Sequence, residues 1–259
     1  MWHDIRILNA VSSTLLGVAA LVLLSAALWW MTQRPMFTLK VIRIDGSAET
    51  QLRRVNALTV RSTALPRIQG NFFTANLDAV RAAFESVPWV RKATVRREWP
   101  NTLLVTIEEH QPLGTWGEDG RLVSVKGDVF TANLDEAEED GELPEFAGPQ
   151  GSATEVVARY AELQKWFAPL DLAPDAVQLS ERYAWKVRLD NGVTVELGRE
   201  QTPATLQERV SRLVSVYPQL VAHLQDRIES VDLRYQNGLA LKASGLVSGI
   251  DGKKKVNGK

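Results

Sequence analysis

Between residues 70 and 112, the spacing of apolar residues changes from a helical period to a strand-like one. Asn76 is one of the residue types that cap helices, and the apolar residues after it recur at about one-turn and two-turn spacings, at Leu77, Val80, Phe84 and Val87. Pro88 cannot continue a helix because it lacks the amide hydrogen. The pattern therefore predicts an amphipathic helix that begins after Asn76 and is stopped by Pro88.

A β-hairpin is predicted directly after this helix. Residues 90–99 and 103–109 favour strands, and Pro100 and Asn101 supply the turn between them. Because successive side chains of a strand point to opposite faces, Glu108 and Glu109 cannot easily share a substrate, and we interpret both as surface charges. This segment has no group arranged for catalysis, so our first hypothesis is a role in structure and interaction.

Two further elements are predicted upstream of the helix. Residues 37–45 are rich in β-branched and apolar residues, which favours a strand. Residues 46–58 can form a helix whose apolar side is made of Leu52, Val55 and Leu58. The predicted order of this region is strand, helix, helix, strand, strand.

Residues 10–31 contain no charged side chain, and about 22 residues at a rise of about 1.5 Å span the roughly 30 Å hydrocarbon core of a bilayer. Trp29 and Trp30 suit the membrane interface at the end of this run. A cleaved signal peptide is the alternative, but it would have a shorter apolar run and small residues at its end. We therefore predict a transmembrane helix over residues 10–32.

Charge alone does not settle the orientation of this helix. Arg6 and the amino terminus precede it, whereas Arg34, Lys40 and Arg43 follow it closely. The count of positive charges therefore points to a cytoplasmic carboxy-terminal part. Long domains, however, are translocated largely regardless of charge, so the opposite orientation stays open.

The second half of the chain is predicted to be rich in strands. Short strands are predicted at residues 122–125 and 128–132. Residues 135–142 carry six acidic side chains, which we interpret as an exposed loop, because a hard-cation loop needs ligands at set spacings. Residues 154–167 predict a helix. A second helix is predicted from a stripe of apolar residues, opened by Thr202 and Pro203 and broken or bent at Pro218; the stripe consists of Leu206, Val210, Leu213, Val214 and Tyr217.

Two Asn-Gly pairs give the strongest local signals in this half. Asn191-Gly192 and Asn237-Gly238 are each flanked by alternating apolar residues, the pattern typical of a β-hairpin. Residues 245–259, which follow the second hairpin, are polar and rich in lysine and glycine. We therefore expect residues 238–244 to form the last strand, at the edge of a sheet.

Composition and charge exclude several classes of protein. The net charge of −1 argues against a general nucleic-acid binder, although residues 34–110 carry twelve basic and seven acidic side chains and residues 111–160 carry three and eleven. The chain has no cysteine, which excludes disulfides, thiol catalysis and cysteine-based zinc sites.

No catalytic, metal-binding or cofactor-binding residue is predicted. The three histidines, His3, His110 and His223, are dispersed and lack metalloprotease spacing. We interpret the tryptophans outside the apolar run as core or core-edge residues: Trp89, Trp99, Trp116, Trp166 and Trp185. A basic cluster on the first predicted hairpin is interpreted as solvated, with anionic lipid or a partner as the alternative; it consists of Arg91, Lys92, Arg96 and Arg97.

Three phrases of the chain, taken together, carry a resemblance to a known family. They are GNFF at residues 70–73, PWVRKATVRREWPNTLLVTIEEHQP at residues 88–112 and VDLRYQNG at residues 231–238. Together they resemble the FtsQ/DivIB family of bacterial cell-division proteins, and the order of elements after the apolar run resembles a POTRA domain. The resemblance extends from that run to about residue 245.

The resemblance implies an α+β protein with a single transmembrane helix, then a POTRA domain (β-α-α-β-β) and a β-rich domain with flanking helices. The implied ranges are 1–9 for a cytoplasmic tail, 10–32 for the membrane helix, 37–109 for the POTRA domain, 110–244 for the β domain and 245–259 for a disordered tail. It also implies a location in the inner membrane at the division septum, with the carboxy-terminal domain in the periplasm.

The implied function is a non-enzymatic scaffold whose last strand docks the partners FtsB and FtsL by strand addition. Carried over by motif, the partner-binding residues are Arg234, Tyr235, Gln236, Asn237 and Gly238, and the strand after them, with Leu239 and Leu241, offers its backbone. Arg182, just before the Trp185 strand, is a further candidate for pairing with an acidic residue of the partner. Tyr235 is the expected anchor because tyrosine combines a large apolar ring with one hydrogen-bonding group. The chain departs from the family in having no aromatic residue shortly after Gly238, which bears on partner affinity.

Two alternatives remain at this point. A POTRA-type chaperone for secretion or outer-membrane assembly would be expected to have repeated POTRA units or an attached barrel. A membrane-tethered hydrolase would need two or more acidic residues that converge in one pocket.

Overall fold

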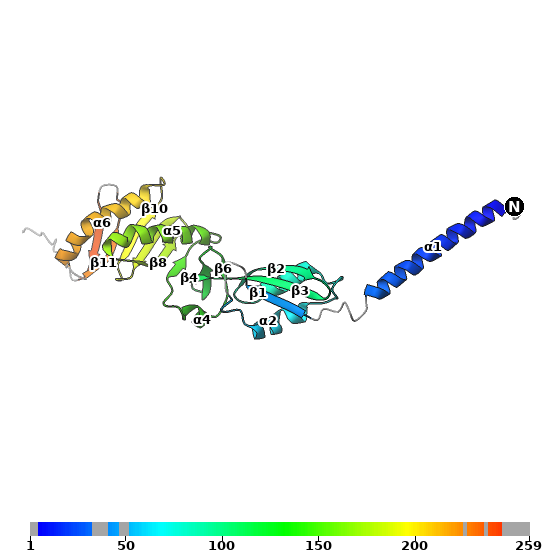
Figure 1. The fold of residues 1–259 in the computed structure, drawn as a ribbon. Coiled ribbons are helices and arrows are strands. Elements are labelled where there is room, and N and C mark those ends of the chain that lie inside the picture. The colour runs from blue at the N-terminus through cyan, green and yellow to red at the C-terminus, as the bar shows by residue number, and fades with distance from the viewer. Residues whose placement is uncertain (1–4, 33–40, 47–51, 225–226, 236–237, 245–259) are drawn as a thin grey trace, which may run out of the picture. The chain divides into compact units, whose positions relative to one another are not determined.

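A computed structural model describes residues 5–32, 41–46, 52–224, 227–235 and 238–244. The chain divides into two compact units between His110 and Gln111 (Figure 1). The first unit contains the apolar helix and a small three-stranded domain, and the second contains a nine-stranded sheet.

The apolar run forms helix α1 (Ile5–Thr32), of which Asn9–Met31 is long and apolar enough to cross a membrane, with a mean hydropathy of 2.2. Three of its hydroxyl groups, those of Ser13, Thr14 and Ser25, bond within the helix; Ser25 Oγ donates to the Leu21 carbonyl at 2.8 Å, and Ser13 Oγ donates to the Asn9 carbonyl at 2.7 Å. Trp29 and Trp30 are exposed near its carboxyl end. The helix fits a single-pass membrane protein.

The small domain of the first unit has the predicted order of elements. Strand β1 (Val41–Gly46) is followed by α2 (Ala57–Thr63), the 3-10 turn η2 (Leu65–Arg67) and α3 (Leu77–Glu85), then by β2 (Val90–Glu98) and β3 (Thr102–Glu109). The sheet order is β1-β3-β2, with β1 parallel and β2 antiparallel to β3. Leu103, Val105 and Ile107 are fully buried against Phe84 and Val80.

The prediction for α3 is confirmed, apart from its end. The Asn76 side chain accepts hydrogen bonds from the amides of Asp78 and Ala79, as a helix cap does. The helix ends at Glu85, with Ser86 as its C-cap, so it stops before Pro88 rather than at it. A residue before proline is disfavoured in helical geometry, which explains the early end.

The helix predicted over residues 46–58 is wrong for residues 46 and 52–56, and residues 47–51 lie outside the described residues. Residues 52–56 are not helical, and α2 begins only at Ala57, after the cap Asn56. The carboxylate of Glu109 accepts the backbone amides of Arg53 (2.8 Å), Arg54 (2.5 Å) and Val55 (3.0 Å). Glu109 is therefore not a surface charge as predicted: it is only 4% exposed and holds this segment in a non-helical conformation.

The tryptophan predictions are confirmed in part. Trp89, Trp116 and Trp185 are buried, and Trp166 packs partly buried against the core of the second unit. Trp99 is 67% exposed, so its assignment to the core is wrong. Trp99 lies in the β2–β3 turn, beyond the end of the paired strands, where the small sheet has no interior to receive it.

In the second unit one mixed sheet runs through the whole fold, in the order β12-β11-β10-β9-β8-β7-β4-β5-β6. Its strands are β4 (Pro112–Trp116), β5 (Arg121–Ser124), β6 (Val129–Phe130), β7 (Glu145–Ala147), β8 (Pro174–Leu179), β9 (Ala184–Leu189), β10 (Thr194–Arg199), β11 (Ile228–Asp232) and β12 (Ala240–Ala243). Helix α5 (Ala153–Phe167) packs on β8, and α6 (Thr205–Leu224) packs on β10. A 3-10 turn, η3 (Ala168–Leu170), follows α5.

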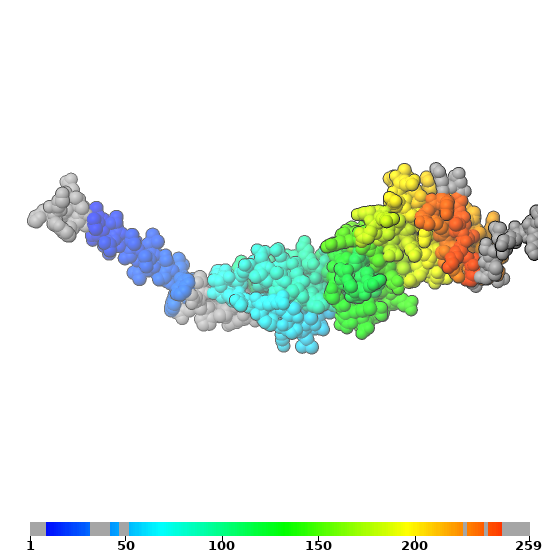
Figure 2. All heavy atoms as spheres, turned by 180° about the vertical axis from the view of Figure 1, so that it is seen from behind, coloured from blue at the N-terminus to red at the C-terminus, as the bar shows by residue number. Residues whose placement is uncertain are grey.

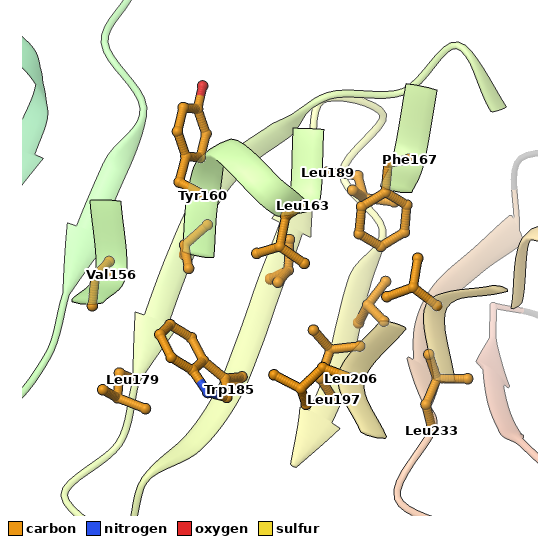
Figure 3. Packing of buried hydrophobic residues seen from close by; sticks show 14 of the residues in the cluster. Val156, Tyr160, Leu163, Phe167, Leu179, Trp185, Leu189, Leu197, Leu206 and Leu233 are labelled. Atoms are coloured by element: carbon orange, nitrogen blue, oxygen red, sulfur yellow. The ribbon is translucent and has the colours of Figure 1, made fainter. Parts of the chain in front are cut away.

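The core of this unit lies between the two helices and the sheet. Figure 3 shows side chains of α5, among them Leu163 and Phe167, facing side chains of the sheet such as Trp185 and Leu189. Leu206 of α6 and Leu197 of β10 continue the same layer toward Leu233. Because a single core extends as far as Leu233, the last hairpin is part of the folded unit.

The helix over 154–167, the two strands near residue 125 and the hairpin at Asn191-Gly192 are confirmed. Strands β11 and β12 also pair as antiparallel neighbours, with Asp232 opposite Ala240, but Asn237 lies outside the described residues, so a turn at Asn237-Gly238 stays a prediction. The acidic run is not wholly a loop, because α4 (Leu134–Glu138) begins after the cap Asn133. Helix α6 begins at Thr205, later than predicted, and continues through Pro218 without a break. Leu213, Tyr217, Leu220 and Val221 pack against the core on both sides of the proline, which holds the two halves in one helix.

Candidate partner-binding edge

Strand β12 forms one edge of the sheet, as the hairpin pattern predicted. Among the described strands it pairs only with β11, in the register Asp232↔Ala240, Val231↔Leu241 and Ser230↔Lys242. The Ser244 amide donates to the Arg227 carbonyl at 2.8 Å, toward the β11 side. Since successive amides of a strand point in opposite directions, those of Leu241 and Ala243 point away from β11.

Side chains on one face of β12 and in the turn before it pack against the core of the second unit. Leu239 and Leu241, two of the predicted partner-binding residues, are partly buried and pack against the main core. Their side chains are therefore largely used within the fold. What β12 offers outward is its backbone together with the exposed side chains of Ala240 and Lys242.

Polar contacts hold β12 against β11 from the other face. Lys242 Nζ lies 2.7 Å from Glu229 Oε2, and Ser244 Oγ donates to Glu229 Oε1 at 2.6 Å. These contacts lower the pKa of Glu229, mainly through Lys242, and the pKa of Lys242 is raised in turn. The pair is exposed, so it aligns the strand more than it stabilises it.

The turn that leads into β12 carries the predicted Arg234. Its guanidinium forms a bidentate pair with Asp232, with Nη2 to Oδ2 at 2.6 Å and Nε to Oδ1 at 2.9 Å, and reaches Glu196 Oε2 at 3.3 Å. The hydrogen bonds from Arg234 hold the pKa of Asp232 below its ordinary value, and the pKa of Arg234 is raised. Arg234 thus binds carboxylates of its own domain and is not presented to a partner as a free cation.

Tyr235 is the large side chain that the turn displays, with 58% of its surface exposed. Helix α6 holds the backbone of this turn, because Nη1 of its residue Arg212 donates hydrogen bonds to the carbonyls of Tyr235 (3.0 Å) and Gly238 (3.3 Å). In Figure 2 the orange and red atoms of residues 227–235 and 238–244 lie at the surface of the second unit. Gln236 and Asn237, also predicted as partner-binding, lie outside the described residues.

The sequence did not predict three residues that contact this turn or the strand beside it: Arg212, Arg209 and Gly198. Arg209 Nη1 donates to the carbonyls of Leu197 (2.6 Å) and Arg199 (2.9 Å), across an irregularity of β10. Gly198 has a φ of +75°, and a Cβ there would lie 2.8 Å from Cγ of Arg234. The only signal in the sequence is a pair of arginines three residues apart on α6.

Arg182 is exposed in the turn between β8 and β9. Because β9 pairs with β10 through Ala184↔Arg199, and β10 with β11 through Glu196↔Asp232, this turn lies at the same end of the sheet as Arg234. Strands β9 and β10 separate the two positions, and no ion pair among the described residues joins them. The fold therefore places Arg182 near the candidate edge without bringing it into contact.

The described residues form no arrangement typical of an active site. A hollow of about 540 Å³ on the sheet is lined by Glu145, Lys186 and Arg188 among others. Arg188 Nη2 pairs with Asp175 at 2.7 Å and with Glu145 at 3.2 Å, and these carboxylates raise the pKa of Arg188. No group of three or more His, Asp or Glu side chains that could hold a metal is found in the described part of the chain.

Comparison with known proteins agrees with this architecture. Residues 37–110 match the family described as "POTRA domain, FtsQ-type", and residues 114–234 match "Cell division protein FtsQ/DivIB, C-terminal". The cell division protein FtsQ of Burkholderia pseudomallei is 53% identical over 246 residues, which cover 95% of this chain and 96% of that protein.

More distant relatives match over a similar length. FtsQ of Bordetella pertussis is 45% identical over 93% of this chain and 92% of its own length. FtsQ of Neisseria gonorrhoeae is 28% identical over 93% of this chain and 95% of its own length. The chain therefore belongs to the FtsQ family of cell division proteins.

Proposed function

We propose that this protein is a non-enzymatic scaffold of the divisome and that β12 holds an FtsB and FtsL pair by accepting a strand from FtsB. The observation that carries this proposal is the outer side of β12, where the amides of Leu241 and Ala243 point away from the sheet and no other strand of the described residues pairs. An edge strand with unpaired backbone groups is a template for another strand. The added strand would extend the nine-stranded sheet by one.

The turn before β12 supports the same role. Tyr235 is exposed beside the edge, and Arg212 fixes the carbonyls on either side of the turn. A side chain on a fixed backbone loses less conformational entropy on binding than one on a mobile loop, which suits an anchor residue. Leu239 and Leu241 would support binding indirectly, because their side chains pack against the core of the second unit and hold β12 in place.

Membrane attachment places this edge on one side of a bilayer. In the proposed arrangement residues 1–9 are cytoplasmic, α1 crosses the inner membrane, and both folded units lie in the periplasm at the septum. The POTRA domain would serve recruitment by other membrane proteins of the divisome. Alkaline phosphatase fused to the carboxyl end would be active in this orientation, and an inactive fusion would reverse it.

The first test replaces the exposed ring. Tyr235→Glu puts a charge where the partner would bury an aromatic side chain, so pull-down of FtsB should be lost while the circular dichroism spectrum is unchanged. Val125→Glu is the matched control, since Val125 is also exposed (44%) but follows β5, at the other side of the sheet. Retained binding by Tyr235→Glu would refute this site.

The second test removes one outward amide. Ala243→Pro deletes a hydrogen-bond donor that faces away from β11, a position at which an edge strand tolerates proline. Ala243→Val keeps the amide and adds a side chain of similar size. We expect the proline variant to lose FtsB binding and the valine variant to keep it; equal binding by both would show that the backbone is not the template.

A further inference from the structure

The first unit displays an aromatic tip that the partner-binding edge does not explain. The tip consists of Phe72, Phe73 and Trp99, from the loop before α3 and the β2–β3 turn. Phe72 is buried and forms edge-to-face contacts with both other rings, with centroids 5.2 Å from Phe73 and 5.9 Å from Trp99. Phe73 and Trp99 expose 45% and 67% of their surfaces.

The tip is held rigid by an arginine of β2. Arg97 Nε donates to the Phe72 carbonyl at 2.6 Å, and Nη2 donates to the Ala75 carbonyl at 2.8 Å. Asn71 closes the loop from within, because its side chain accepts the amides of Phe73 and Thr74. Two neighbouring large rings thus keep much of their surface exposed, and grouped exposed apolar side chains often mark a binding surface.

The strand register places this tip at the end of the domain that is tethered to α1. Strand β1 begins at Val41, which pairs with Thr102, and β3 begins at Thr102 directly after the β2–β3 turn. The chain therefore enters the domain beside Trp99. From Thr32, where α1 ends, to Val41 there are nine residue steps, so the tether is at most roughly 30 Å long.

The charge around the tip is positive. Arg43 and Arg96 both pair with Leu104 of β3, from opposite sides, which brings the two arginines onto the same face of the sheet. Glu98 is the acidic residue beside them, and it pairs with Arg43 Nη1 at 3.5 Å. Arg97 binds neutral carbonyls and so keeps its charge, which leaves Arg96 and Arg97 in excess over the local acid.

We propose that this aromatic tip inserts into the headgroup region of the bilayer that α1 crosses, and that exposed Arg96 attracts anionic lipid there together with the remaining charge of Arg97. Tryptophan and phenylalanine are favoured at this depth, and basic side chains add attraction to anionic lipid. The proposal commits to lipid because the tether keeps the tip near the membrane in every state of the protein. Insertion would give the small domain a defined orientation on the membrane surface, independent of any partner at β12.

The absence of cysteine from the chain allows a direct test. Full-length protein with Asn101→Cys carries one label in the β2–β3 turn, whereas Lys92→Cys places the label toward the other end of β2, where Lys92 pairs with Glu108. Each variant is labelled with the fluorophore NBD and reconstituted without other proteins into vesicles of phosphatidylcholine and phosphatidylglycerol. We expect blue-shifted emission and quenching by doxyl-labelled lipid at residue 101 and neither effect at residue 92.

Substitutions of the two rings and changes of lipid composition then show what causes the emission shift at residue 101. Phe73→Ser with Trp99→Ser should abolish the blue shift at residue 101, and Leu58→Ser, which removes a side chain that is 76% exposed in α2, should leave it unchanged. Replacing phosphatidylglycerol by phosphatidylcholine should weaken the quenching with the native rings in place, a result that needs no variant that alters the tip. A water-like emission at residue 101 in both kinds of vesicle would overturn the proposal and leave the tip to a protein partner.

Discussion

Each of the two folded regions has a loop with an exposed aromatic side chain, and in each an arginine donates hydrogen bonds to carbonyls of the loop. In the first unit Arg97 binds the carbonyls of Phe72 and Ala75, and Phe73 and Trp99 are exposed. In the second unit Arg212 binds the carbonyls of Tyr235 and Gly238, and Tyr235 is exposed. The shared device fixes a loop by charged hydrogen bonds to backbone oxygens, without using a carboxylate.

The surroundings of the two loops differ, and the difference indicates different ligands. Two exposed rings with excess basic charge lie at the tethered end of the first unit, an arrangement that suits a lipid surface. One tyrosine lies beside an open strand in the second unit, where Arg234, Lys242 and their acidic partners neutralise one another. Such an edge suits a polypeptide that pairs by backbone hydrogen bonds.

The largest expected effect is a difference in the loss of stability between replacing a buried tryptophan and replacing an exposed one. Trp89→Ala should cost about 3–5 kcal/mol, because Trp89 is 3% exposed, whereas Trp99→Ala should cost about 1 kcal/mol through its edge contact with Phe72. Native-state hydrogen exchange of the β3 amides measures both without requiring the whole chain to unfold in two states. Similar losses for the two variants would mean that Trp99 is packed after all.

The clamp on the aromatic tip comes next. Arg97→Ala should cost about 2 kcal/mol, since it removes charged hydrogen bonds to two carbonyls of the loop. Arg96→Ala, one position away and exposed, is the matched control and should change stability little. If the control were as costly as Arg97→Ala, the loop would not depend on the clamp.

The corresponding clamp in the second unit should be weaker. Arg212→Ala should cost about 1 kcal/mol, because its hydrogen bonds to Tyr235 and Gly238 are longer, at 3.0 and 3.3 Å. Faster hydrogen exchange should be confined to the β11–β12 hairpin, and FtsB binding should weaken with it. Arg209→Ala, which acts on β10, provides the comparison. Unchanged exchange in Arg212→Ala would show that the two loops are not built alike.

The smallest effect is a pH dependence that only the second loop should show. The Arg234 hydrogen bonds lower the pKa of Asp232, so their contribution is complete above the ordinary value of 3.8 and is lost as the pH falls through the depressed folded-state pKa. NMR shifts of the Tyr235 and Gly238 amides should therefore change only below that value, and Asp232→Asn should remove the change. The Phe73 amide should not follow, because Arg97 binds carbonyls that do not titrate in this range.

The elements with a clear local period could be predicted from sequence. Helix α3, helix α5 and the hairpin at Asn191-Gly192 form where apolar spacing and capping or turn residues agree. The resemblance in three phrases also pointed to the family that the comparisons show. The candidate turn at Arg234 and Tyr235 was named in the same way.

The errors arose where a distant residue decides the conformation. Residues 52–56 have helical spacing, but Glu109, more than fifty positions later, binds three of their amides and prevents a helix. Pro218 carries a strong local signal for a break, yet packing on both sides keeps α6 continuous. Trp99 is a residue type that is usually buried, but its turn lies beyond the sheet.

By itself, the sequence determined the apolar helix, the order of elements in the small domain, and helix α5 and the last pair of strands in the second unit, because these depend on periodicity and turn chemistry within a few residues. Strands β4, β7 and β8 of the second unit were not predicted. Only the tertiary structure decided that Arg212 binds the carbonyls of the turn before β12, and that Trp99 is exposed beside the start of β1. Strand pairing and long hydrogen bonds join residues far apart in the chain, and no local pattern encodes which of them will meet.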